Sequence, residues 1–176
     1  MNIREDYQVK EGSCYKQERQ KVLLKELVKG KSRGLQIGLN AGDSAYLFLE
    51  ETQGTLISYD IGTHKYIDEV HKRLGPNHKL VKGDSVITLT AEKHRDYDYI
   101  YIDGGHSYRC ASNDLKNCLK IANKDTLIIL DDYVRDKELI RKHNVGVIKA
   151  YAEIKVRELG QEDFGKGRGL IYFMIE

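Results

Sequence analysis

The residues best suited to chemistry lie in the segment DYDYIYIDGGHSYRC, which runs from Asp96 to Cys110. An apolar run of tyrosine and isoleucine ends there in Asp103, two glycines and His106. A carboxylate and an imidazole at this spacing could serve as a general base, as metal ligands or as substrate contacts. A buried strand has no structural need for such an ending, so the segment predicts a functional site.

Acids or glycines recur where the other apolar runs end. A single aspartate in such a place is explained by capping of the helix that follows. Repetition is harder to explain in this way, because the ligands of open α/β sheets bind at the carboxyl ends of the strands. The pattern therefore predicts one shared site, formed by Gly38, Asp60, Asp84, Asp103, Asp131 and Asp132.

The elements that would position these residues alternate between short apolar runs and helical patterns. This alternation favours an α/β fold with a mostly parallel sheet. An opening helix ends at Gly30, and the residues from Ile154 to Glu176 predict an antiparallel hairpin around the turn FGKGRG. Strands are expected at residues 33–39, 54–60, 78–84, 97–103 and 125–132, with helices near 44–51, 64–75, 85–93, 107–122 and 145–155.

Composition limits the function classes. The chain has 176 residues and a net charge of +2, with scattered basic residues, so it lacks the basic face of a nucleic-acid binder. Its three cysteines have no metal-binding spacing, which suits reduced thiols in the cytoplasm. No apolar run is long enough to span a membrane. We expect one domain over residues 1–176, with a helical segment at 1–32 and the core at 33–176.

The first glycine-containing loop, QIGLNAGDSAY, predicts binding of a nucleoside. Gly38 and Gly42 lie between a strand and a helix, where glycine lets the backbone approach a ligand and the helix offers free N–H groups. Asp60 ends the next strand, where a carboxylate can hold both hydroxyls of a ribose. An NAD site would use the same arrangement, but the third glycine of its fingerprint is absent.

The motifs QIGLNAGDSA, SYD, KGDS, YIDGGHSY and LDDY resemble those of class I S-adenosylmethionine-dependent methyltransferases. More narrowly, they are similar to small-molecule O-methyltransferases of the macrocin or sugar type. The likeness runs from Gly34 to Tyr133. It implies a Rossmann-like, doubly wound sheet with an antiparallel C-terminal hairpin, S-adenosylmethionine as cofactor, and methyl transfer to a hydroxyl of a small molecule such as a sugar.

The resemblance also implies roles for individual residues. Gln36 stands where the family often has an acid that contacts the methionine amino group. Asp60 would hold the ribose, and Asp84 and Ser85 the adenine. Asp103 would touch the cofactor as well as the acceptor. The methionine end would be lined by Gly38, Asn40, Gly42 and Ser44, and a divalent cation would be bound by Asp103, Asp131 and Asp132.

Methyl transfer from a sulfonium needs an acceptor oxygen held in line with the methyl carbon. A bound Mg²⁺ would acidify a coordinated hydroxyl, and oxygen ligands favour Mg²⁺ over zinc. Without a metal, Asp103 could act alone as the base. His106 is open to use as base, ligand or substrate contact, whereas Tyr101 is expected in the core. We expect the remaining histidines on the surface, namely His64, His71, His78, His94 and His143.

Other functions stay open from the sequence. The protein could methylate RNA or another protein, or it could be a non-catalytic module that keeps the cofactor-binding fold. The short chain leaves little room for a separate substrate domain. The acceptor pocket must therefore come from the N-terminal segment, from residues 133–144, or from a second subunit in a homodimer.

Overall fold

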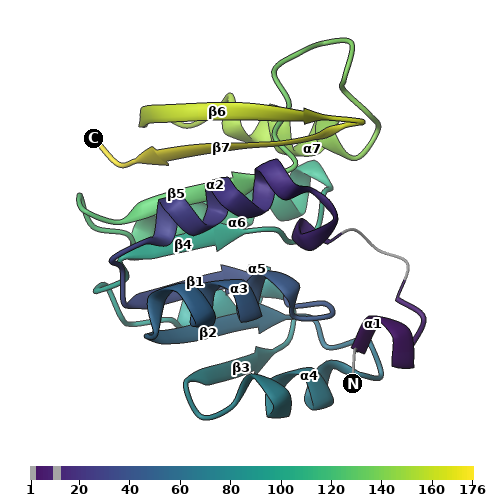
Figure 1. Ribbon diagram of the computed structural model, residues 1–176. Coiled ribbons are helices and arrows are strands. Elements are labelled where there is room, and N and C mark those ends of the chain that lie inside the picture. The colour runs from purple at the N-terminus through teal and green to yellow at the C-terminus, as the bar shows by residue number, and fades with distance from the viewer. Residues whose placement is uncertain (1–2, 10–12) are drawn as a thin grey trace.

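The computed structural model describes residues 3–9 and 13–176 of the chain. Seven strands form one sheet in the order β3-β2-β1-β4-β5-β7-β6 (Figure 1). The first five strands are parallel, β7 runs antiparallel to β5, and β6 runs antiparallel to β7. The strands are β1 (Arg33–Ile37), β2 (Thr55–Asp60), β3 (His78–Lys82), β4 (Tyr99–Ile102), β5 (Leu127–Asp131), β6 (Arg157–Gly165) and β7 (Arg168–Met174).

Helices cover both faces of this sheet (Figure 1). One core layer lies under α2, α3 and α4, and the other lies under α6, α7 and the short turn η2. This three-layer arrangement confirms the predicted Rossmann-like, doubly wound sheet with its antiparallel C-terminal hairpin. The helices are α1 (Ile3–Asp6), η1 (Cys14–Lys16), α2 (Glu18–Val28), α3 (Asp43–Thr52), α4 (Ile67–Leu74), α5 (Ser85–Thr88), η2 (Leu89–Ala91), α6 (Tyr108–Ile121) and α7 (Asn144–Tyr151).

The central strands β4 and β5 are buried on both faces, which explains the continuous apolar runs in their sequences. Every residue of β4 is buried, and so are the first four residues of β5, as expected for parallel strands covered on both faces. Side chains alternate between the two layers. Tyr99 and Tyr101 pack edge-on against Phe48 of α3, with ring centroids 5.3 and 5.2 Å away, while Ile100 and Ile102 join the layer under α6.

The strand order reverses beside β1, which pairs with β2 on one side and with β4 on the other. This topology predicts a crevice above the carboxyl ends of β1 and β4. The two strand ends are held together, because Ile37 pairs with Ile102 and the Asp103 N–H donates to the Ile37 carbonyl over 2.9 Å. The fold thus brings the predicted site residues to one edge. Within the described residues, no helix has the length and apolar character needed to cross a bilayer.

Candidate active site

A cavity of about 950 Å³ opens at the carboxyl edge of the sheet. Its walls come from the loop after β1, the ends of β2, β4 and β5, the N-terminal segment around η1, and the β6–β7 turn. The structure therefore brings most of the predicted site residues together. Those that line the cavity are Gly38, Asn40, Ser44, Asp60, Asp84, Ser85, Asp103, His106, Asp131 and Asp132.

The loop after β1 can follow its path only because it contains glycine. Gly38 has a φ of +87°, and a Cβ placed on it would lie 2.0 Å from the Asp103 carbonyl oxygen. Gly42 begins α3 with a φ of +83°, and its Cβ would lie 2.6 Å from Cγ1 of Val70. Gly42 is thus required for packing against α4, whereas Gly38 lets the β1 loop touch the β4 loop at the cavity wall.

Asp60 braces the same loop from the end of β2. Its Oδ2 accepts hydrogen bonds from the backbone N–H groups of Leu39 at 2.8 Å and Asn40 at 3.2 Å, and its Oδ1 accepts from Gly62 N–H at 2.8 Å. Carboxylate oxygens have further lone pairs, so Asp60 can still accept from a ligand. Asp84 caps α5 through a 3.0 Å bond from Val86 N–H, which places Ser85 at the wall.

Gln36 lies fully buried behind this loop and does not line the cavity. Its Oε1 accepts from the Ser44 hydroxyl at 3.3 Å, whereas its Nε2 has no hydrogen-bond partner among the described residues. The contact between Gln36 and a methionine group stays a prediction.

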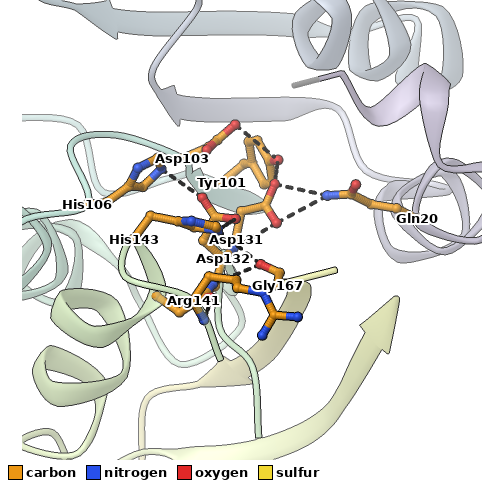
Figure 2. A network of polar contacts seen from close by, with 10 residues as sticks. Gln20, Tyr101, Asp103, His106, Asp131, Asp132, Arg141, His143 and Gly167 are labelled. Atoms are coloured by element: carbon orange, nitrogen blue, oxygen red, sulfur yellow. Dashed lines mark hydrogen bonds and ion pairs between the residues drawn. The ribbon is translucent and has the colours of Figure 1, made fainter. Parts of the chain in front are cut away.

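The acids after β4 and β5 form a connected network (Figure 2). Tyr101 donates its hydroxyl in a short hydrogen bond to Asp131 and lies 3.5 Å from Oδ2 of Asp103. Gln20 of α2 donates its Nε2 to both oxygens of Asp131, at 3.1 and 2.9 Å. His106 Nε2 lies 2.7 Å from Oδ2 of Asp132. One buried tyrosine therefore links the acid of β4 to the acid of β5.

The crowding of these acids changes their affinity for protons. Burial raises the pKa of Asp103 well above its usual range, and the charges of Asp131 and Asp132 raise it further. Burial, together with the charge of Asp132, raises the pKa of Asp131 to about 6. The hydrogen bond to Asp132 raises the pKa of His106. The cluster therefore favours bound positive charge, either as protons or as a cation.

Three side chains of this cluster could hold one metal ion. Ligand atoms of Asp103, His106 and Asp132 all lie within 4.8 Å of one another. Asp131, which the sequence placed in the metal set, is engaged otherwise: its oxygens accept from Gln20, Tyr101 and the backbone N–H of Asp132. The geometry thus gathers His106, rather than Asp131, with the other two acids.

Sequence reasoning missed several residues of the cavity. Tyr101 is buried as expected, but its hydroxyl belongs to the site. Its place on β4, two residues before Asp103, was a usable signal, because alternate residues of an extended chain share a face. His64 and His143 both line the cavity: His64 is half-buried, whereas His143 is exposed as expected, with its Nε2 3.1 Å from the Gly167 carbonyl oxygen.

The surface prediction is also wrong for His78, which is only 4% exposed. Its Nε2 lies 2.6 Å from the Ser58 hydroxyl, and its Nδ1 lies 2.8 Å from Nδ1 of His71. Burial, together with the charge of His71, lowers the pKa of His78 to about 4. The pairing of β2 with β3 brings Ser58 to His78, and α4 supplies His71, so the pattern along any one element carries no signal of these contacts.

Comparison with known proteins identifies the family of the chain and the proteins that share its fold. A family model described as a methyltransferase domain matches residues 35–133, and a search of curated protein sequences gives no match. The S-adenosylhomocysteine-bound methyltransferase PaMTH1 of Podospora anserina is similar in structure, with a TM-score of 0.69 and 17% identity over 89% of this chain and 78% of that chain.

Two further solved structures of methyltransferases are similar to this chain. The O-methyltransferase of Bacillus cereus in complex with S-adenosylhomocysteine has a TM-score of 0.69 and 22% identity over 94% of this chain and 83% of that one. The N-methyltransferase NodS of Bradyrhizobium japonicum has a TM-score of 0.69 and 16% identity, covering 92% and 96%. Since the family model spans more than half of the chain, the protein belongs to the methyltransferase domain family and has the class I S-adenosylmethionine-dependent methyltransferase fold.

Proposed function

We propose that the protein is an S-adenosylmethionine-dependent O-methyltransferase that acts on a hydroxyl of a small molecule such as a sugar, assisted by a divalent cation. The observation that carries the proposal is the single cavity that joins the glycine loop of β1 to the acids after β4 and β5. A nucleoside bound over the loop would place its reactive end beside Asp103. The motifs YIDGGHSY and LDDY, which resemble those of small-molecule O-methyltransferases, support oxygen as the acceptor atom.

The cofactor would lie across the ends of β1, β2 and β3. Gly38, Asn40 and Ser44 would contact its methionine end, with Gln36 and Gly42 shaping the loop from behind. Asp60 would accept from the ribose hydroxyls, and the acid at the start of α5 would accept from the adenine amine. The residues of the last contact are Asp84 and Ser85, which lie at the cavity wall.

The reaction follows from the raised proton affinity of the acids. The acceptor hydroxyl would give its proton to the Asp103 carboxylate or to the His106 imidazole, and its oxygen would attack the methyl carbon. The bond between sulfur and methyl breaks with its electron pair on sulfur, which leaves S-adenosylhomocysteine. Tyr101 and Gln20 would keep Asp131 in place, so that its charge continues to favour protonation of Asp103.

The donor set fits a divalent cation. Asp103 and Asp132 offer the carboxylate oxygens that Mg²⁺ and Mn²⁺ prefer, and His106 adds an imidazole, a ligand that suits iron or zinc. A cation held there would acidify a coordinated acceptor hydroxyl and screen the clustered negative charge.

The walls on the acceptor side contain residues of the N-terminal segment, namely Ser13, Cys14, Lys16, Gln17 and Gln20. This supports the N-terminal segment as a source of the acceptor pocket. All three cysteines lie in the described part of the chain as free thiols, which agrees with the cytoplasmic location that we propose.

Calorimetry with S-adenosylhomocysteine tests the cofactor, and transfer of labelled methyl to a panel of hydroxyl compounds tests the reaction. We expect Asp103→Asn to keep cofactor affinity and to abolish turnover, because it removes the base and one metal ligand. The exposed Asp125→Asn is the matched control and should behave as wild type. Absence of cofactor binding by the wild type, or normal turnover by Asp103→Asn, would refute the proposal.

A further inference from the structure

We propose that the methyl acceptor carries an oxyanion, a carboxylate or a phosphate, which Arg168 binds together with Lys16 and Lys166. All three cations line the cavity, although they come from η1, the β6–β7 turn and the start of β7. The inference rests on the proposed function, since it names the substrate class for the same site.

The sheet topology assigns the two halves of the cavity. The loops after β1, β2 and β3 form the half proposed for the cofactor. The other half lies above β4, β5 and β7. Because Asp131 pairs with Leu170, the start of β7 at Arg168 and the turn at Lys166 extend past the end of β5, beside the acid cluster. The cations therefore lie where an acceptor would enter.

Arg168 is the half-buried member of the set. Its guanidinium donates one hydrogen bond, from Nη1 to the Ser13 carbonyl oxygen at 3.3 Å. Within the described residues, no carboxylate oxygen lies at ion-pair distance from it. Its charge still reaches the acids, because it lowers the pKa of Asp103 and Asp131 against the larger effect of burial. A guanidinium has several N–H donors in a planar fork, so most of this fork is available to a ligand.

Lys16 and Lys166 belong to the two chain segments that Arg168 joins through its hydrogen bond to Ser13. The link between their segments is direct, because Gln17 Nε2 donates to the Phe164 carbonyl oxygen at 3.3 Å. Neither lysine has an ion-pair partner in residues 3–9 and 13–176. The cofactor half differs: there, Arg4 Nε lies 2.6 Å from Oδ2 of Asp43, so this cation already has a carboxylate partner.

Two explanations for these cations can be compared. If they served only to balance Asp103, Asp131 and Asp132, they would be expected within ion-pair distance of those carboxylates. Within the described residues, none of the three cations forms an ion pair with those carboxylates, although all of them line the same cavity, so they remain available to a second anion. Arginine binds carboxylates and phosphates through paired hydrogen bonds, and lysines add charge. An acceptor could therefore place its hydroxyl beside Asp103 and its oxyanion beside Arg168, so that each group of side chains has a partner on the same molecule.

The test is anion binding by the full chain, without added metal. Inorganic phosphate and acetate are titrated by NMR into the wild type, Arg168→Gln, and the double variant Lys16→Gln/Lys166→Gln. We expect saturable binding to the wild type, and a dissociation constant raised about tenfold in each variant, because charge-assisted hydrogen bonds are lost. Stronger binding of phosphate than of acetate would indicate a phosphorylated acceptor, and the reverse a carboxylate.

The control variant is Lys124→Gln, an exposed lysine in the turn before β5, which should bind as the wild type does. Affinity for S-adenosylhomocysteine is measured on every variant, and equal values show that the cofactor half is intact. Failure of the wild type to bind either anion, or equal binding by the wild type and Arg168→Gln, overturns the inference. If the wild type does not bind S-adenosylhomocysteine, the proposed function is wrong instead. Failure of the anion-binding inference and failure of the proposed function therefore give different results.

Discussion

Gly38→Ala tests whether the close approach of the β1 and β4 loops shapes the site. The added methyl group would start 2.0 Å from the Asp103 carbonyl oxygen, and the backbone there has a φ of +87°. The left-handed conformation costs an alanine about 1–2 kcal/mol. An ordinary contact requires the Asp103 backbone to retreat by more than about 1 Å, and such overpacking costs about 1–3 kcal/mol. We therefore expect a total loss of about 2–5 kcal/mol in the free energy of unfolding.

Gly30→Ala is the matched control. Gly30 has a φ of +75°, and a Cβ built on it meets nothing within 4 Å, so only the conformational cost of about 1–2 kcal/mol applies. Urea unfolding gives the free energy of unfolding of both variants. The difference between them isolates the cost of the steric contact with Asp103 from the cost of the left-handed backbone conformation. Methyl-transfer assays of the folded fraction should show a loss of about 100-fold for Gly38→Ala, because misplacing a reacting group by about 1 Å has that effect. Equal stability of the two variants, with full activity, would refute the reasoning.

Three further predictions concern buried charge and metal. Burial raises the pKa of Asp114 to about 6, although a hydrogen bond with the Ser85 side chain acts in the opposite direction. The folded state therefore keeps this proton longer than the unfolded state, and stability falls as pH rises from about 4 through 6. Asp114→Asn should then gain about 1–3 kcal/mol at pH 8 and little at pH 4 in urea unfolding; an unchanged or lower stability at pH 8 would contradict this. For His78, the lowered pKa of about 4 means that the unfolded state binds the proton first, so stability falls as pH drops from about 6.5 to 4. His78→Gln should flatten this part of the pH profile by about 1–3 kcal/mol, and identical profiles would count against the burial argument. EDTA should suppress methyl transfer and Mg²⁺ should restore it, whereas full activity in chelator would leave Asp103 or His106 as a metal-free base.

The sequence alone determined the fold class and the edge of the sheet where the site lies. The apolar runs of β4 and β5 report burial on both faces, and the acids that end them fall at one edge because parallel strands share a direction. Asp103 and Asp132 could be selected in this way because their positions follow from local pattern. The helix expected at residues 107–122 is likewise found as α6, and Ser107 caps it by accepting from the Cys110 N–H at 3.2 Å.

Only the tertiary structure decided which side chains meet at that edge. Gln20 contacts Asp131 across 111 residues of chain, and Arg168 contacts Ser13 across 155. Periodicity describes the surroundings of a residue along its own element, but it does not encode which distant partner packs there. That choice depends on strand register and on the placement of α2 and the β6–β7 turn over the sheet. For this reason Asp131 proved to be held by Gln20 and Tyr101, and His106 joined Asp103 and Asp132 instead.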